Sequence, residues 1–299
     1  MSTHAPQEWR DWHARRVATV SGPYGPLTLT GTHWPADHPD GRIEGLPGVW
    51  TERGDGIVLR AAAGDGLTVD GEPADGEFHL GQDGDPTATR VAVGERHLLV
   101  LRREDRWAVR DYDPDAAARR AFAGIEVYEY DERWVLPGLF RPYAQGRTVR
   151  VPHADGQRRG LGLAGELAFT VAGDEHTLEV AVEGDGSLWA VLADDTSGTD
   201  SYRFRFLRPP APAEDGTVTV DFNRTLLPPC AFADHFLCPF PPPGNTLPIA
   251  LRAGSGTESS TDSSHRPTEG VSAAPAAVNE AAGAECWGRR YGGRPARHL

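Results

Sequence analysis

The sequence predicts a mainly β protein, in which an N-terminal helix precedes two consecutive antiparallel β units, sandwich- or barrel-like, joined by a short helix. Short stretches alternate between apolar and polar residues, and Gly-Asp or Asp-Gly pairs separate many of them. Glycine (35) and proline (25) are abundant among the 299 residues. These two residues supply the backbone angles that tight turns need, so the composition favours short strands joined by turns.

The first element predicted is a helix over residues 6–18, within an N-terminal helical segment 1–20. Pro6 suits the first turn of a helix, where its missing N–H costs nothing. Trp9, Trp12, Arg16 and Val17 fall on one face at helical spacing. We interpret the two tryptophans as packing residues.

Residues 21–112 are predicted to form an N-terminal β unit. Alternation marks strands at 27–30 and 87–93, and turn signals recur at 54–56, 64–66 and 70–71. Asp113-Pro114 then has the pattern of a helix N-cap followed by proline in the first turn. It predicts a short connecting helix over 114–122, closed by Gly124.

Residues 113–254 are predicted to form the C-terminal β unit. Strands are expected at 167–171 and 177–182, around a turn at Gly173-Asp174, and at 217–220 and 246–251. The nearly continuous apolar run 188–192 predicts a central strand buried on both faces. Residues 255–299 are rich in Ser, Thr, Ala and Gly, and predict a disordered tail.

Composition excludes several classes of function. A net charge of −13 argues against a nucleic-acid partner. All 30 basic residues of the Lys+Arg count are arginine, which excludes lysine Schiff bases, lysine-anchored pyridoxal phosphate and a Walker A loop. No run reaches the roughly 18 apolar residues of a membrane span, and no signal peptide is recognisable. We expect a cytoplasmic protein with reduced cysteines, no membrane contact and no cofactor.

Three familiar motifs are present only in part. Residues 160–165, Gly-Leu-Gly-Leu-Ala-Gly, match a dinucleotide fingerprint, but an alternating strand follows where a helix is required. Asp111 begins a calcium-like loop that lacks the glycine and the bidentate glutamate. Residues 195–198, Asp-Thr-Ser-Gly, resemble an aspartic protease loop without the usual triplet or a second copy.

The polar residues of the segment 194–245 are the candidates for a ligand site. Asp194 and Asp221 each follow a predicted strand, and strand ends place side chains at the rim of a sheet, where a carboxylate can act as a base or a ligand. An arginine can bind an anionic group with two hydrogen bonds, and hydroxyl and amide groups can orient a polar substrate. The candidate ligand-binding residues are Asp194, Thr196, Ser197, Tyr202, Arg205, Asp221, Asn223, Asn245 and His33.

Cys230, His235 and Cys238 are weak candidates for a metal site. Their loose spacing needs a fourth ligand, which only the fold could supply from His33, His153 or Asp194. Inert buried thiols that hold a proline-rich loop are the favoured alternative. Cys230 as a nucleophile would need a neighbouring base, for which His33, His153 and His235 are the candidates.

An ordered series of motifs over residues 8–254 resembles the bacterial and archaeal domain-of-unknown-function family 1684. The matching segments are 31–34, 110–114, 122–125, 194–198, 202–207, 221–224, 228–232, 238–242 and 245–248. Gly244 and Ser255 stand where the family usually has glutamate. The family brings no established activity, so the resemblance bears on the fold and not on the chemistry.

Two functions remain open on the sequence. The first is a small-molecule site, with or without catalysis, built from the polar residues of 194–245. The second is a structural or interaction module in which the same side chains satisfy one another and hold the loops. An open cleft lined by Asp194, Arg205, Asp221 and Asn245 would favour the first. Internal pairing without solvent would favour the second.

Overall fold

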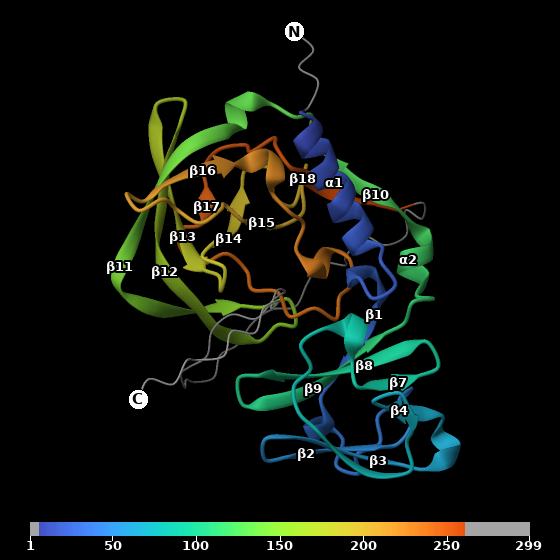
Figure 1. The fold of residues 1–299 in the computed structure, drawn as a ribbon. Helices are drawn as coiled ribbons and strands as arrows, with labels where there is room; N and C mark the ends of the chain where they lie inside the picture. Colours follow the sequence, from blue (N-terminus) through green and yellow to red (C-terminus); the bar gives the residue numbers. More distant parts are fainter. Residues whose placement is uncertain (1–5, 261–299) are drawn as a thin grey trace, which may run out of the picture.

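The structure is a computed structural model that describes residues 6–260. It begins with helix α1 (Gln7–Val20), which carries the predicted stripe: Trp9 is buried, and Trp12, Arg16 and Val17 are half-buried. Trp9 Nε1 donates to the carbonyl of Asn223 at 2.8 Å, and Arg16 donates to the carbonyl of Leu227 at 3.0 Å. Figure 1 shows α1 lying along the part of the molecule formed by the C-terminal half of the chain. The helix is therefore part of that unit's packing. None of the helices described has the length and hydrophobicity that crossing a bilayer requires.

The N-terminal β unit contains two antiparallel sheets. The larger has the order β1-β9-β8-β7-β4-β5 and the smaller the order β2-β3-β6. A core that includes Trp50, Leu59, Val100 and Trp107 fills the space between them. The strands are β1 (Leu29–His33), β2 (Val49–Arg53), β3 (Gly56–Ala61), β4 (Leu67–Val69), β5 (Glu72–Pro73), β6 (Gly76–Leu80), β7 (Val91–Val93), β8 (Arg96–Arg103) and β9 (Arg106–Tyr112).

The C-terminal β unit is a curled antiparallel sheet with the order β15-β14-β13-β12-β11-β16, to which β17 adds by pairing with β14. In Figure 1 the long strands β11 and β12 bend around the other strands, so the sheet forms part of a barrel. The strands are β11 (Val135–Pro152), β12 (Arg158–Val171), β13 (Asp174–Val182), β14 (Leu188–Asp194), β15 (Arg205–Leu207), β16 (Thr217–Asp221) and β17 (Thr246–Leu247).

Both faces of β14 are covered, as the apolar run 188–192 predicts. Leu188, Ala190 and Leu192 belong to one core cluster of the curled sheet. Trp189 and Val191 point to the opposite face and belong to a second cluster. That second cluster also contains residues of the N-terminal unit, so a shared apolar core joins the two β units.

The predicted fold class is confirmed, whereas several boundaries differ. The connecting helix α2 is shorter than predicted (Ala117–Ala121), and its N-cap is Ala116. The Asp113 carboxylate instead accepts from the backbone N–H of Asp115, which makes a turn before the helix. Gly124 does not close the helix. It lies within β10 (Phe122–Val127), at a positive φ of 147°.

The strand expected at 246–251 is limited to the two residues of β17, because Asp195 N–H bonds to Ile249 O and Leu251 N–H bonds to the Asp194 carboxylate outside any ladder. The final strand is instead β18 (Ser255–Ser260), which pairs with β10 in antiparallel fashion. Residues 255–260 thus lie within the fold, although we expected the tail to begin at 255. The rest of the expected tail, 261–299, is outside the described residues.

The dinucleotide-like segment 160–165 lies within β12, and β11 and β13 flank it. No dinucleotide-binding helix follows it, so its glycines have another role. A Cβ atom on Gly165 would stand 2.5 Å from the carbonyl oxygen of Arg141 and 2.5 Å from the Phe140 ring. A Cβ atom on Gly162 would meet nothing within 4 Å. Gly165 is therefore needed for the close approach of β11 and β12.

We predict that Gly165→Ala lowers the free energy of unfolding by about 1–3 kcal/mol, since the new methyl group would force apart two paired strands. Gly162→Ala, three residues earlier on the same strand, is the matched control and should change it by less than about 0.5 kcal/mol. Urea denaturation of both variants measures the difference. Equal effects at the two positions would contradict the proposed role of Gly165.

Candidate functional site

Asp194 and Arg205, the two strongest candidates, form an ion pair that is completely enclosed. Both side chains have an exposed fraction of 0%, and Arg205 Nη2 donates to Asp194 Oδ2 at 2.7 Å. The guanidinium also donates to the carbonyls of Leu251 (2.9 Å), Ala253 (2.7 Å) and Ser255 (3.1 Å). One side chain on β15 thus fixes the end of β14 and the segment that leads into β18.

The remaining capacity of the Asp194 carboxylate is also used internally. Its Oδ1 accepts from the backbone N–H of Thr196 (2.9 Å), the Thr196 hydroxyl (2.6 Å) and the N–H of Leu251 (3.2 Å). The Ser197 hydroxyl accepts from the N–H of Asp194 at 3.1 Å. A carboxylate with these partners stabilises the turn after β14.

Asn245 connects two strands where their own pairing ends. The ladder between β13 and β14 is formed at Ala181–Trp189 and Val182–Leu188. Beyond it, the buried Asn245 side chain accepts from the N–H of Glu179 (2.8 Å) and donates to the carbonyls of Glu179 and Val191, both at 2.9 Å. The side-chain amide therefore takes the place of a peptide group between the strands.

Asp221 and Asn223 form a separate group at the end of β16. Asp221 Oδ1 accepts from the backbone N–H and the side-chain amide of Asn223, both at 3.0 Å, in an Asx turn. The buried Asn223 amide also exchanges two 3.0 Å hydrogen bonds with the backbone of Asp131. Asp221 is half-buried and lies 3.2 Å from Arg224. The hydrogen bonds of Asp221 and Asn223 stabilise the loop after β16, as those of Asp194 stabilise the turn after β14.

His33 lies in the N-terminal unit, on β1. A Cβ atom on Gly31 would stand 2.3 Å from His33 Nε2, so the imidazole packs over that glycine. Burial lowers the pKa of His33, while the nearby Asp111 carboxylate raises it. Asp111 is in turn held by Arg96, whose Nε donates to it at 3.1 Å. Of the other candidate site residues, His235 is the one whose charge affects the pKa of His33, which it lowers.

Cys230 and Cys238 lie side by side, but His235 does not join them. Both cysteines are buried, neither is in a disulfide, and their thiols are hydrogen-bonded to each other. Tyr202 Oη donates to the Cys230 carbonyl at 3.1 Å and lies 3.7 Å from Cys230 Sγ. The His235 side chain is exposed. Within residues 6–260, no three His, Cys, Asp or Glu side chains are grouped as metal ligands.

Comparison with known proteins identifies the C-terminal unit. Residues 120–256 match the family described as "Protein of unknown function (DUF1684)". This segment belongs to the DUF1684 family. The part of the expected resemblance that precedes residue 120 lies outside the match. Asp194, Arg205, Asn245 and both described cysteines lie inside the DUF1684 segment, whereas His33 does not.

A solved relative comes from an archaeon. It is the solution NMR structure of the uncharacterized protein from gene locus rrnAC0354 of Haloarcula marismortui, with 27% identity over 46% of this chain and 79% of that chain. The TM-score is 0.39. No curated protein matches the chain.

The DUF1684 segment also contains a polar cluster that the sequence analysis did not single out. Glu166 on β12 pairs directly with Glu179 on β13, so both side chains point to the same face as Trp189. The Tyr143 hydroxyl lies 3.0 Å from a Glu179 carboxylate oxygen and 3.5 Å from a Glu166 one. Arg147 pairs with Glu179 and its guanidinium lies 4.5 Å from the centre of the Tyr143 ring.

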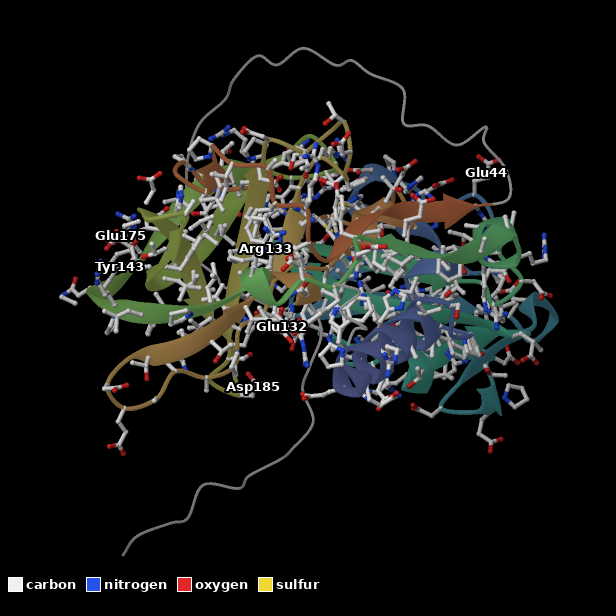
Figure 2. The ribbon with its side chains drawn as sticks, turned by 90° about the horizontal axis from the view of Figure 1, so that it is seen from above. Glu44, Glu132, Arg133, Tyr143, Glu175 and Asp185 are labelled. Atoms are coloured by element: carbon white, nitrogen blue, oxygen red, sulfur yellow. The ribbon has the colours of Figure 1, made fainter. Side chains whose placement is uncertain are left out.

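Alternation assigns Glu166 and Glu179 to a solvent face, which is why sequence reasoning passed over them. The side chain of Glu179 is only 13% exposed, because the bend of β11 brings Tyr143 and Arg147 over it. Figure 2 shows Tyr143 at this bend, at the end of the C-terminal unit that is remote from the N-terminal unit. A bend in a strand is a property of the folded sheet and leaves no signal in local alternation.

His153 is a further buried polar residue of the DUF1684 segment. Its Nδ1 lies 2.8 Å from the carbonyl of Leu237, so Nδ1 carries the proton of the neutral ring. Its Nε2 is buried and has no hydrogen-bond partner among the described residues. Burial lowers the pKa of His153, since an imidazolium would lose its hydration there.

We predict that Asp194→Asn lowers the free energy of unfolding by about 3–5 kcal/mol, because it leaves the Arg205 charge buried without a counter-charge. Asp195→Asn is the matched control: it makes the same change at the next residue, whose side chain is exposed. The control should differ from the wild type by less than about 0.5 kcal/mol. Chemical denaturation followed by circular dichroism measures both. An Asp194→Asn protein as stable as the control would contradict the role assigned to the ion pair.

The stability of the protein should fall as the pH drops from about 7 to about 5. Folding lowers the pKa of His153, so below about pH 6.5 the unfolded chain is protonated at His153 while the folded chain is still neutral there. Protonation therefore favours the unfolded chain as the pH falls. His153→Asn keeps a donor for the Leu237 carbonyl but cannot titrate, so its stability should depend less steeply on pH.

His33 shifts in the same direction, and some slope should remain in the His153→Asn variant. His79→Asn, at a side chain that is 78% exposed, is the control and should follow the wild-type profile. Thermal melts over this pH range measure the slopes. Superimposable profiles for the wild type and His153→Asn would contradict the assignment.

Proposed function

We propose that the chain is a non-enzymatic structural or interaction module, whose DUF1684 motif residues hold the loops of the curled sheet together. The observation that carries this proposal is the Asp194–Arg205 pair, in which both side chains are enclosed and every hydrogen bond described goes to the protein itself. A general base must come within hydrogen-bond distance of the proton it removes. An enclosed, fully engaged carboxylate does not meet that requirement.

The other motif residues support the same proposal. Asn245 and Asn223 are completely buried, and the side-chain amide of each is hydrogen-bonded to backbone groups of a neighbouring strand or loop. Asp221 is partly exposed, but its carboxylate closes a turn and faces Arg224. The net charge of −13 adds a reason to exclude nucleic acid as the partner.

The second candidate function is the binding of a small molecule. Because the motif residues are paired with one another, we propose the polar cluster as its site. This cluster consists of Tyr143, Arg147, Glu166 and Glu179. Two facing carboxylates, a hydroxyl and a guanidinium can together bind a polar ligand with several hydroxyl or amino groups. The observation in its favour is that Tyr143, Glu166 and Glu179 are half-buried on one face of the sheet, beside the exposed Arg147.

Native mass spectrometry combined with denaturation discriminates the two candidates. Under the module proposal, Asn245→Ala leaves three backbone groups without partners and lowers the free energy of unfolding by about 3 kcal/mol. The mass spectrum of the purified wild-type protein then shows the chain alone. Gln145→Ala, which removes an exposed amide in the same segment, is the matched control and should keep wild-type stability.

A bound small molecule at one equivalent in the wild-type spectrum would overturn the module proposal. Loss of that molecule in Glu179→Gln, with retention in a folded Asn245→Ala protein, would support the polar-cluster site. Loss in both folded variants would return the site to the motif residues.

A further inference from the structure

The two thiols of the DUF1684 segment are held next to each other by short, firmly packed segments. Cys230 lies in the 3-10 helix Pro229–Ala231, and Cys238 lies just before the bridge between His153 and Pro239. The N–H of Ala154 donates to the Cys238 carbonyl at 2.9 Å. Both sulfur atoms belong to the same core cluster and are hydrogen-bonded to each other. Their proximity is therefore fixed by the fold.

Seven residues separate the two cysteines, and the packing of this loop restricts how it can move. Phe232 is 4% exposed and Phe236 is 1% exposed, and each is inserted in a core cluster. A disulfide between Cys230 and Cys238 would close a small ring on a segment that is already anchored. Because the two thiols are already hydrogen-bonded, forming this bond calls for a movement of the sulfur atoms toward each other.

The surroundings of Cys230 favour its thiolate form. The Tyr202 hydroxyl lies 3.7 Å from its sulfur, and the exposed Arg203 lies over the rings of Tyr202 (5.5 Å) and Phe240 (4.9 Å). Hydrogen bonds from Cys238 and Tyr202, together with the Arg203 charge, outweigh burial and lower the pKa of Cys230. The half-buried Tyr202 and the exposed Arg203 also mark the side from which a small oxidant would approach.

We propose that Cys230 and Cys238 form a redox pair that a hydroperoxide oxidises to a disulfide and a dithiol reductant restores. The Cys230 thiolate attacks the terminal peroxide oxygen: an S–O bond forms, the O–O bond breaks, and the leaving oxygen takes a proton and departs as an alcohol or water. Cys238 then attacks the sulfenic sulfur. The S–S bond forms and water leaves, so the two thiols lose two electrons and the peroxide gains them.

This inference goes beyond the module proposed above, and its failure would leave that proposal intact. Each chain would consume one peroxide per oxidation, as a sensor does. The oxidised protein should unfold at a temperature higher by about 5 °C, because the disulfide restrains a nine-residue ring in the unfolded chain.

The test uses the full chain with Cys286→Ser, so that the two described cysteines are the thiols left. Hydrogen peroxide is added to the folded protein, and the remaining thiols are alkylated after denaturation and counted by intact mass. The expected result is the loss of both thiols and of two hydrogen atoms in mass, with recovery after dithiothreitol. Cys238→Ser in the same background should yield a Cys230 sulfenic acid that dimedone traps, and Cys230→Ser should react at least about tenfold more slowly.

Tyr202→Phe should slow the oxidation by about tenfold, since it removes a hydrogen bond that stabilises the thiolate. Tyr24→Phe is the matched control, because the Tyr24 hydroxyl donates to the carbonyl of Glu95 instead. It should oxidise at the wild-type rate. Retention of both thiols in the folded protein, or equal rates for the two single-cysteine variants, would overturn the proposal.

Discussion

The C-terminal unit depends on the hydrogen bonds and the ion pair of the Arg205 guanidinium. It lies in the interior with an exposed fraction of 0%, and it touches three carbonyls and one carboxylate that come from distant parts of the chain. Placing an arginine in such a position costs a large desolvation energy unless its hydrogen bonds are made. The end of β14 and residues 251–255 must therefore meet around it, and this brings β18 to β10.

The curled sheet creates the need for such polar side chains. A sheet that bends strongly separates neighbouring strands, and their backbone groups then lose partners. Asn245 supplies partners between β13 and β14, and Asp194 supplies them to the turn that follows β14. Gly165 permits the close approach of β11 and β12 at the bend. The polar side chains of the motif thus supply hydrogen-bond partners to backbone groups that the curvature of the sheet leaves unpaired.

Much of the secondary structure follows from sequence patterns. Local alternation locates β12, β13 and β16, the apolar run 188–192 locates β14, and the tryptophan spacing locates α1, because these signals depend on neighbours in the chain. The strand β18 escapes prediction because its residues are small and polar, and its stability comes from pairing with β10 more than a hundred residues away. Tertiary pairing of this kind has no local signature.

The candidate site was predictable as a set of residues but not as an arrangement. The motif marks Asp194 and Arg205 as special, yet composition cannot say whether a carboxylate faces a ligand or an arginine. The cysteine pair shows the same limit: the expected histidine partners of Cys230 are replaced by Cys238, Tyr202 and Arg203. Contacts between loops determine which groups surround Asp194 and which surround Cys230, and local sequence patterns do not show these contacts.

Amide hydrogen exchange under native conditions tests the central claim most directly, namely that the motif residues form the structural centre of the curled sheet. The amides of Thr196 and Leu251 donate to the Asp194 carboxylate, and the amide of Glu179 donates to Asn245. We predict that these three amides exchange only through global unfolding, with the same free energy as the most protected amides of β14. Exchange through local opening, at a free energy lower by about 2 kcal/mol or more, would show that the motif is a mobile and accessible site, and would contradict the account.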